Sequence, residues 1–238
     1  MTPLLEISVE SLASAIAAER GGAHRIELCS DLSVGGVTPN AELMRSARAA
    51  VKVPIFAMIR PRGGNFFYSG SELAQMRRDI ELAKYCKMDG VVLGILHADN
   101  TVDIEDTGEL VKTASPLPVT FHRAFDETPD LHEALEAVIQ TGATRILTSG
   151  GEPTAAQGAT VVSDLAAAAA DRITILPGGG INTSNFPAIV RATRAPEFHS
   201  GLGTTLPYGQ SSEAAFSSAV SELVSLLQRQ PPFATSRT

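Results

Sequence analysis

A histidine, an arginine and an aspartate lie within one five-residue stretch of this chain. They are His122, Arg123 and Asp126, and they follow a short apolar run. Imidazole titrates near neutral pH, so His122 is a candidate general acid or base, and Asp126 is a candidate to orient it or to close a loop turn. Arg123 is a candidate contact to a ligand. A histidine that is only hydrogen-bonded inside the fold would give the same pattern, and both interpretations stay open here.

Three glycine-containing segments are candidate contacts to an anion. In the first, Arg60 and Arg62 precede a pair of glycines, and a guanidinium group matches the geometry of carboxylate or phosphate. The other two are Ser149-Gly150-Gly151 and Gly178-Gly179-Gly180. Glycine lets backbone N–H groups approach a ligand closely, and the last segment precedes a predicted helix, whose N-terminus favours anions. Each segment alone has a steric explanation, but together they favour a small anionic ligand.

Two widely separated cysteines, Cys29 and Cys86, are the candidates for thiol chemistry. Neither belongs to a CxxC pair, so we expect reduced thiols and no closed zinc site. Cu(I) prefers thiolate and thioether ligands, and Cys29 could converge on such an ion with Met58 and His122. The alternative is that Cys29 is a small packing residue. His199 is retained as a further candidate ligand contact, because it lies in the last predicted strand.

Short apolar runs alternate along the chain with longer amphipathic segments, which is typical of repeated β/α units. We predict eight strands, at 4–8, 24–29, 54–60, 90–96, 118–123, 145–148, 172–176 and 197–200, and a last helix at 212–228. Eight such units match the (β/α)8 barrel, whose usual length is about 250 residues. An open doubly wound sheet normally has fewer strands, and the first turn lacks the G-x-G-x-x-G pattern. We therefore expect one α/β domain over 1–230, a (β/α)8 TIM barrel, followed by a disordered tail at 231–238.

Side chains alternate along each predicted strand, so one set faces the helices and the other faces the barrel interior. The uniformly apolar set should face the helices. The other set is expected inside the barrel: Glu6, Ser8, Glu27, Cys29, Met58, Arg60, Thr120 and His122. Buried charges need partners, so Glu6 and Glu27 should pair with Arg60 or a neighbour. This set is expected to form either an active site at the carboxyl ends of the strands or a structural layer of ion pairs.

The net charge of −7 limits the classes of partner. With a sequence pI near 5.2, broad binding to nucleic acid or to anionic lipid is not expected. No apolar run reaches the roughly 18 residues of a membrane span, and the first residues do not resemble an export signal. We expect a cytoplasmic protein that binds neither nucleic acid nor membrane.

Several motifs, in order along the chain, resemble the CutC copper homeostasis protein family. The segments that carry the resemblance are 27–30, 35–39, 58–64, 89–92, 120–126, 147–151 and 178–180. The resemblance implies a cytoplasmic TIM barrel, usually dimeric or larger, associated with copper homeostasis and copper binding. Asn40 and Asn65 depart from the residues common at their positions in the family, and both lie in or next to predicted loops.

Two hypotheses of different class follow. As a copper-handling protein, the chain would bind Cu(I) through Cys29, alone or with a second chain that completes the coordination. As an enzyme, it would act on an anionic small molecule, such as a phosphorylated one, by acid–base chemistry. The candidate catalytic residues are Glu27, His122 and Asp126. The candidate ligand contacts are Glu6, Arg60, Arg62, Arg123, Ser149, Gly150, Gly178, Gly179, Gly180 and His199.

Overall fold

The alternating apolar and amphipathic segments fold into parallel strands, each followed by a helix or a helical turn. The structure is a computed structural model that describes residues 3–202 and 213–229. Its strands are β1 Leu4–Val9, β2 Arg25–Leu28, β3 Ile55–Met58, β4 Gly90–Leu93, β5 Val119–Phe121, β6 Arg145–Thr148, β7 Thr174–Pro177 and β8 Glu197–Ser200. Its α-helices are α1 Leu12–Arg20, α2 Ala41–Ala50, α3 Gly70–Tyr85, α4 Ile104–Ala114, α5 Leu131–Thr141, α6 Ala159–Ala169, α7 Phe186–Thr193 and α8 Glu213–Gln228.

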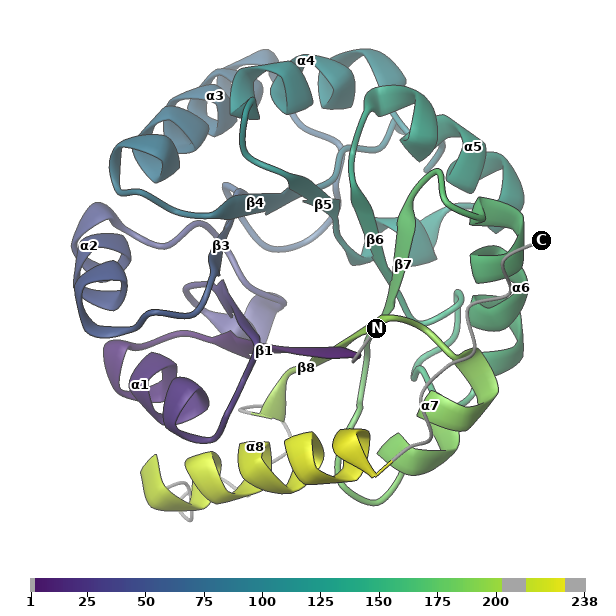
Figure 1. Cartoon of the computed structure of the whole chain (residues 1–238). Helices are drawn as coiled ribbons and strands as arrows, with labels where there is room; N and C mark the ends of the chain where they lie inside the picture. Colours follow the sequence, from purple (N-terminus) through teal and green to yellow (C-terminus); the bar gives the residue numbers. More distant parts are fainter. Residues whose placement is uncertain (1–2, 203–212, 230–238) are drawn as a thin grey trace.

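The strands form one parallel sheet that curves into a nearly closed barrel inside a ring of helices (Figure 1). Neighbours follow the chain from β1 to β7, and β8 pairs with β1. Strands β7 and β8 lie in contact, without a ladder between them in the described part of the chain. The predicted (β/α)8 TIM barrel is therefore confirmed. The predicted tail at 231–238 lies outside the described residues.

The predicted alternation of side chains is also confirmed. The apolar set from β1 and β2, such as Leu5 and Ile26, is buried in one core with helix residues such as Ala15 and Met44. A separate small cluster lies inside the barrel and consists of Cys29, Phe56, Met58 and Val92. The two clusters are distinct because successive side chains of a strand point to opposite faces.

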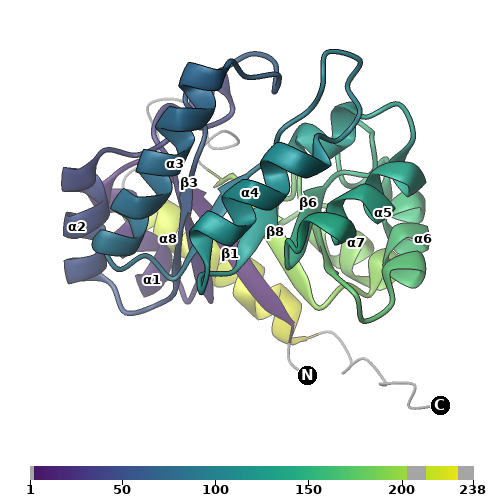
Figure 2. The ribbon, with the colours of Figure 1, turned by 90° about the horizontal axis from the view of Figure 1, so that it is seen from above.

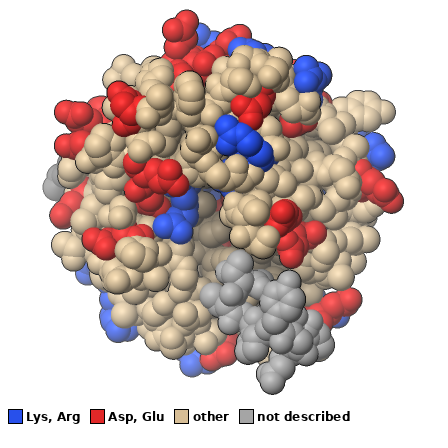
Figure 3. All heavy atoms as spheres, turned by 180° about the vertical axis from the view of Figure 1, so that it is seen from behind, with Lys and Arg blue, Asp and Glu red and all other residues tan. Residues whose placement is uncertain are grey.

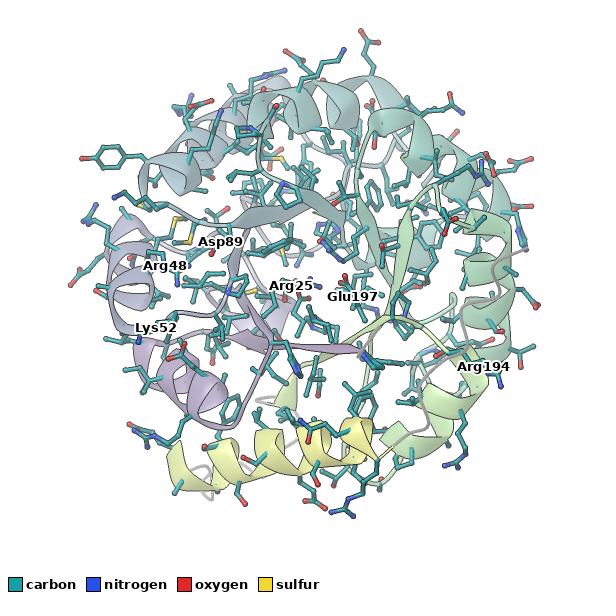
Figure 4. All side chains as sticks on the ribbon, in the orientation of Figure 1. Arg25, Arg48, Lys52, Asp89, Arg194 and Glu197 are labelled. Carbon is teal, nitrogen blue, oxygen red and sulfur yellow. The ribbon has the colours of Figure 1, made fainter. Side chains whose placement is uncertain are left out.

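A network of ion pairs occupies the barrel near the amino ends of the strands. Arg25 of β2 pairs with Glu6 of β1 and lies 2.5 Å from Glu197 of β8, which also accepts from Arg145 of β6 at 2.6 Å. Figure 4 shows Arg25 and Glu197 pointing toward one another near the axis. The centroid of the Phe56 ring lies 4.9 and 5.3 Å from the central carbons of these two guanidinium groups. This end of the barrel is therefore a structural layer of compensated charges.

Capping side chains determine where several helices begin. Asn40, a departure from the family pattern, still caps α2 by accepting from the Leu43 N–H at 2.9 Å. Ser69 and Glu72 form a capping box at the start of α3. Each helix returns the chain to the amino end of the next strand, so all the strand carboxyl ends open on one face, opposite the end where the described chain begins (Figure 2). No helix in the described ranges is long and apolar enough to cross a membrane.

Candidate functional site

The carboxyl ends of the strands enclose a cavity of about 630 Å³. Figure 3 looks onto this face and shows a hollow near its centre. The predicted site residues that line the cavity are Glu27, Arg60, His122, Arg123, Asp126, Gly179, Gly180 and His199. The predicted residues that lie outside its lining are Glu6, Cys29, Arg62, Ser149, Gly150 and Gly178. A barrel of this type usually places its site at this face.

Three ionisable side chains, Glu6, His199 and Glu27, lie in series between the ion-pair layer and the cavity. His199 Nδ1 lies 2.7 Å from Glu6 Oε1, and His199 Nε2 lies 3.9 Å from Glu27 Oε2. Burial would raise the pKa of Glu6, but Arg25 and His199 together lower it to about 2. Burial raises the pKa of Glu27, whose Oε1 has no hydrogen-bond partner among the described residues. Burial would lower the pKa of His199, but Glu27 and Glu6 raise it above its usual value.

Glu6 therefore pairs with Arg25, a neighbour, and not with Arg60. Glu6, Glu27 and His199 also offer ligand atoms within 4.8 Å of one another, a spacing that could hold a metal ion. The sequence did not predict that His199 connects Glu6 to Glu27, although strand alternation places all three side chains on the interior face. Arg25 was missed too, and the alternation that places Glu27 inside the barrel also places Arg25 there.

Cys29 lies directly behind Glu27. Its side chain is fully buried, and its Sγ donates to Glu27 Oε2 at 3.5 Å. Burial, followed by the charge of Glu27, raises the pKa of the Cys29 thiol well above its usual value. The loop after β2 closes over the sulfur so tightly that a Cβ on Gly36 would lie 3.0 Å from Sγ. The thiol is thus a protonated, enclosed group next to the carboxyl group that faces the cavity.

His122 has a different environment from the one expected of a general acid or base. Burial, then the charge of Arg60, lowers the pKa of His122 to about 3, so the ring is neutral at pH 7. Its Nδ1 accepts from the Ala124 N–H at 3.2 Å, which puts the ring proton on Nε2. That nitrogen has no partner within the described ranges. His122 therefore presents a neutral N–H donor at neutral pH.

Of the two roles considered for Asp126, its contacts match the one in a loop turn and not the orientation of His122. Its carboxylate accepts from the backbone N–H groups of Ser149 and Gly151 at 3.0 Å and from Arg123 Nε at 2.7 Å. Thr148 Oγ1 donates to it as well. The segment Arg123–Glu127 forms a short 3-10 helix after β5, and no hydrogen bond between Asp126 and His122 is present among the described residues. Asp126 thus fastens the loop after β6 to the loop after β5.

The two arginines after β3 are held by the protein itself. Arg60 donates to the backbone carbonyls of Val34, Gly36 and Gly64 at 2.8–3.1 Å, and its guanidinium lies 4.7 Å from the Phe66 ring centroid. Only its Nε, which has no partner in the described part of the chain, is uncommitted. Arg60 thus ties the loops after β2 and β3 together.

Arg62 points away from the cavity. Its Nε lies 2.6 Å from Glu72 Oε1, and its Nη1 donates to Asn65 Oδ1 at 3.1 Å. Asn65, the other departure from the family pattern, thus fixes an arginine of its own loop. Of the two arginines predicted to contact an anion, Arg60 lines the cavity and Arg62 does not.

The glycine segments divide into packing positions and cavity positions. A Cβ on Gly150 would lie 2.7 Å from the Gly158 carbonyl oxygen, and one on Gly178 would lie 2.4 Å from Leu147 Cδ1. These two glycines allow close packing behind the cavity. Gly179 and Gly180 have φ of +107° and +69° and line the cavity itself. Ile181, the next lining residue, carries no chemical signal in the sequence, because its contribution is its backbone.

The residues around Cys29 include donors that suit copper. Cu(I) takes thiolate, thioether and imidazole ligands, and Cys29 shares a buried cluster with Met58 while Glu27 links it to His199. The unpartnered Glu27 Oε1 adds a carboxylate oxygen at the same place. Cys29 and His199 are therefore the residues that would hold such an ion, with Glu27 between them.

Comparison with known proteins extends the argument from the site to the whole chain. The model of the CutC family matches residues 3–204. The human copper homeostasis protein cutC homolog is 45% identical over 206 residues, which cover 87% of this chain and 76% of the human protein. A CutC family protein from Chromobacterium violaceum is 44% identical over 84% of this chain and 81% of its own length.

A solved structure agrees with these sequence relatives. The crystal structure of a CutC protein from Streptococcus agalactiae is 33% identical to this chain, with a TM-score of 0.79, and the match covers 83% of this chain and 98% of that one. The matched region of the family model includes every strand of the barrel and every lining residue of the cavity. This chain therefore belongs to the CutC family.

Proposed function

We propose that this chain takes part in copper homeostasis by binding Cu(I) inside the barrel, at Cys29. The single observation that carries the proposal is the position of Glu27 Oε2, 3.5 Å from Cys29 Sγ and 3.9 Å from His199 Nε2. A thiol and an imidazole nitrogen thus flank one carboxylate oxygen, and both are ligands that Cu(I) accepts. The names of the human and mouse relatives, which are copper homeostasis protein cutC homologs, support the same role.

Copper binding here depends on the removal of a proton from the thiol, because thiolate is the metal ligand. Glu27 is the nearest recorded acceptor, since Cys29 Sγ already donates to its Oε2. In this proposal Cys29 and His199 hold the ion. Glu27 takes up the thiol proton or passes it to solvent in the cavity.

The test is an anaerobic competition titration of Cu(I) against a chromophoric chelator. Cys29→Ala is expected to weaken binding at least about tenfold. Cys86→Ala is the matched control, because Cys86 is also a free, buried cysteine but caps the end of α3. Cys86→Ala should bind as the wild type does. Equal affinity in the wild type and Cys29→Ala, or no binding in either, would contradict the proposal.

A second candidate function, acid–base chemistry on a small organic ligand, has its own observation. Glu27 Oε1 is buried, has no hydrogen-bond partner among the described residues and lines the cavity. His199 stands behind it, with its other nitrogen fixed by Glu6. A carboxyl group oriented toward a cavity and backed by a histidine can give or accept a proton of a bound ligand. Ligand screening by thermal shift tests this function, with Glu27→Gln expected to lose the response.

We also propose that the chain acts in the cytoplasm as a homodimer or larger homo-oligomer. Size-exclusion chromatography with light scattering tests the assembly, and a monomeric mass at micromolar concentration would contradict it. Cell fractionation with detection of the native chain tests the compartment.

A further inference from the structure

We propose that one wall of the cavity binds the phosphate group of a small phosphate ester. The donors are Arg123 and the backbone N–H groups of Gly179, Gly180 and Ile181. This inference names a substrate class for the acid–base function proposed above, but the binding it describes stands apart from turnover and from copper. It rests on groups that neither Cys29 nor His199 supplies.

The three backbone N–H groups are consecutive and have no acceptor among the described residues. The preceding Gly178 N–H donates to the Thr148 carbonyl at 2.9 Å, and the following Asn182 N–H donates to Asn185 Oδ1 at 2.9 Å. No recorded hydrogen bond within the described ranges uses the N–H of Gly179, Gly180 or Ile181. All three residues line the cavity. Successive backbone N–H groups in a glycine turn form a concave site for anions.

Hydrogen bonds hold the Nε and Nη2 atoms of Arg123 next to these amides. Its Nε lies 2.7 Å from Asp126 Oδ2, and its Nη2 donates to Ser149 Oγ at 2.7 Å. Its Nη1 has no hydrogen bond in the part of the chain that the structure describes, and a Cβ on Gly179 would lie only 3.2 Å from it. The absence of a side chain at Gly179 lets the guanidinium lie against the glycine backbone. A held guanidinium loses little side-chain entropy when an anion binds.

The carboxylate of Asp126 forms an ion pair with Arg123, so an approaching anion meets this pair and not an isolated negative charge. The other donors that hold the carboxylate in place are Thr148 Oγ1 and the backbone N–H groups of Ser149 and Gly151. Asp126 therefore acts as a positioning residue that sets the direction of the guanidinium.

Three more groups that line the same cavity are nearly fully buried yet unpartnered within 3–202 and 213–229. They are Glu27 Oε1, Arg60 Nε and His122 Nε2, in side chains of residues that are 4–5% exposed. A buried polar atom without a partner is costly and calls for a ligand or a water. His122 and Arg60 offer N–H donors, which fit hydroxyl or carbonyl oxygens. The ligand is therefore a phosphate ester that carries such oxygens.

The size and charge of the cavity refine this class. A volume of about 630 Å³ falls within the range of small-molecule sites. Glu127 and Glu152 also line the cavity, so selection depends on the placed donors and not on a broadly positive surface. An ester that reaches both the amides and the buried donors should bind more tightly than inorganic phosphate alone.

Amide NMR of the isotopically labelled wild-type protein tests the site directly. The probes are inorganic phosphate, glycerol 3-phosphate and, as a neutral control, glycerol. We expect saturable shifts of the Gly179, Gly180 and Ile181 amide signals with the two phosphates and none with glycerol. The Kd should be at least about tenfold lower for the ester than for phosphate. Absence of shifts at these three amides would overturn the proposal.

Arg123→Met supplies the second arm and should raise the Kd for glycerol 3-phosphate at least about tenfold. Arg172→Met is the matched control, because both arginines pair with one acid and have similar side-chain exposure, 41% and 45%. Arg172 lies outside the cavity lining, so its variant should bind as the wild type does. An unchanged Kd in Arg123→Met would overturn the role of Arg123. Failure of either arm leaves the copper titration, which depends on Cys29, unaffected.

Discussion

His199 Nδ1 and Glu6 Oε1 lie 2.7 Å apart and join β8 to β1, the neighbouring strands that come from opposite ends of the chain. The contact connects the ion-pair layer of the barrel to its cavity, because Glu6 also binds Arg25 and His199 faces Glu27. The ion-pair layer and the cavity at the carboxyl ends of the strands are therefore connected through the carboxylate of Glu6. The predictions below separate their contributions.

Glu6→Gln should strongly destabilise the fold. The change leaves the buried Arg25 with one carboxylate fewer, and breaking a buried pair typically costs about 3–5 kcal/mol. Urea unfolding at pH 7 measures the loss. Glu136→Gln, which breaks the exposed pair with Arg172, is the control and should cost far less, because water screens exposed ion pairs. Equal losses in the two variants would contradict the assigned role of the buried layer.

The contribution of Glu6 should also depend on pH. Its pKa is lowered to about 2 in the folded chain, so the carboxylate stabilises the fold above its ordinary pKa of 4.5. This stability is lost as the pH falls from about 4.5 toward 2. The difference in unfolding free energy between the wild type and Glu6→Gln should therefore shrink across that window. A constant difference from pH 6 to pH 3 would count against an ionised Glu6.

His122 should remain neutral throughout the physiological range. Its pKa is lowered to about 3, so the unfolded chain binds a proton below pH 6.5 that the folded chain does not. The stabilising contribution is full above pH 6.5 and falls as the pH drops from about 6.5 toward 3. Imidazole nitrogen NMR should show a proton on Nε2 and no titration between pH 5 and 8. A titration near pH 6.5 would restore His122 as a general acid or base.

Arg60 and Arg62 should differ sharply in their effect on stability. Arg60→Met removes donors to three backbone carbonyls and should cost about 2–4 kcal/mol. Arg62→Met removes a partly exposed ion pair with Glu72 and exposed hydrogen bonds to the carbonyls of Asn65 and Phe67, so its cost should be much smaller. Thermal or urea unfolding of both variants measures the contrast. Similar costs would show that Arg60 does not hold the loops.

Gly178→Ala should destabilise the chain by overpacking. Its Cβ would lie 2.4 Å from Leu147 Cδ1 and 3.1 Å from His199 Cβ, and forced atoms in a packed core cost about 1–3 kcal/mol. Gly70→Ala is the control, since a Cβ there has no heavy atom within 4 Å and α3 begins at that residue. It should be neutral or slightly stabilising. A neutral Gly178→Ala in urea unfolding would show that this glycine is not needed for packing.

The amino-acid sequence by itself determined the barrel and the side of each strand. Alternation along β1, β2 and β3 separated Leu5 and Ile26 from Glu6, Glu27 and Cys29, because the period of two is a local property of an extended backbone. The same alternation also places Arg25 inside the barrel. Its ion pairs with Glu6 and Glu197 become visible only when β1 and β8 are placed beside it. The order of the strands was also readable, since each unit brings the chain to the next strand.

Only the tertiary structure decided which interior groups meet. His199 reaches Glu6 because β8 closes onto β1 in one register, and Arg60 contacts carbonyls because two loops fold around it. Asp126 and His122 are close in sequence but share no hydrogen bond among the described residues. The phosphate-binding wall depends on backbone N–H groups, which every residue type except proline possesses. Distances across the barrel decide which side chains pair, which groups are protonated and which backbone N–H groups lack an acceptor among the described residues. No local pattern in the sequence encodes those distances.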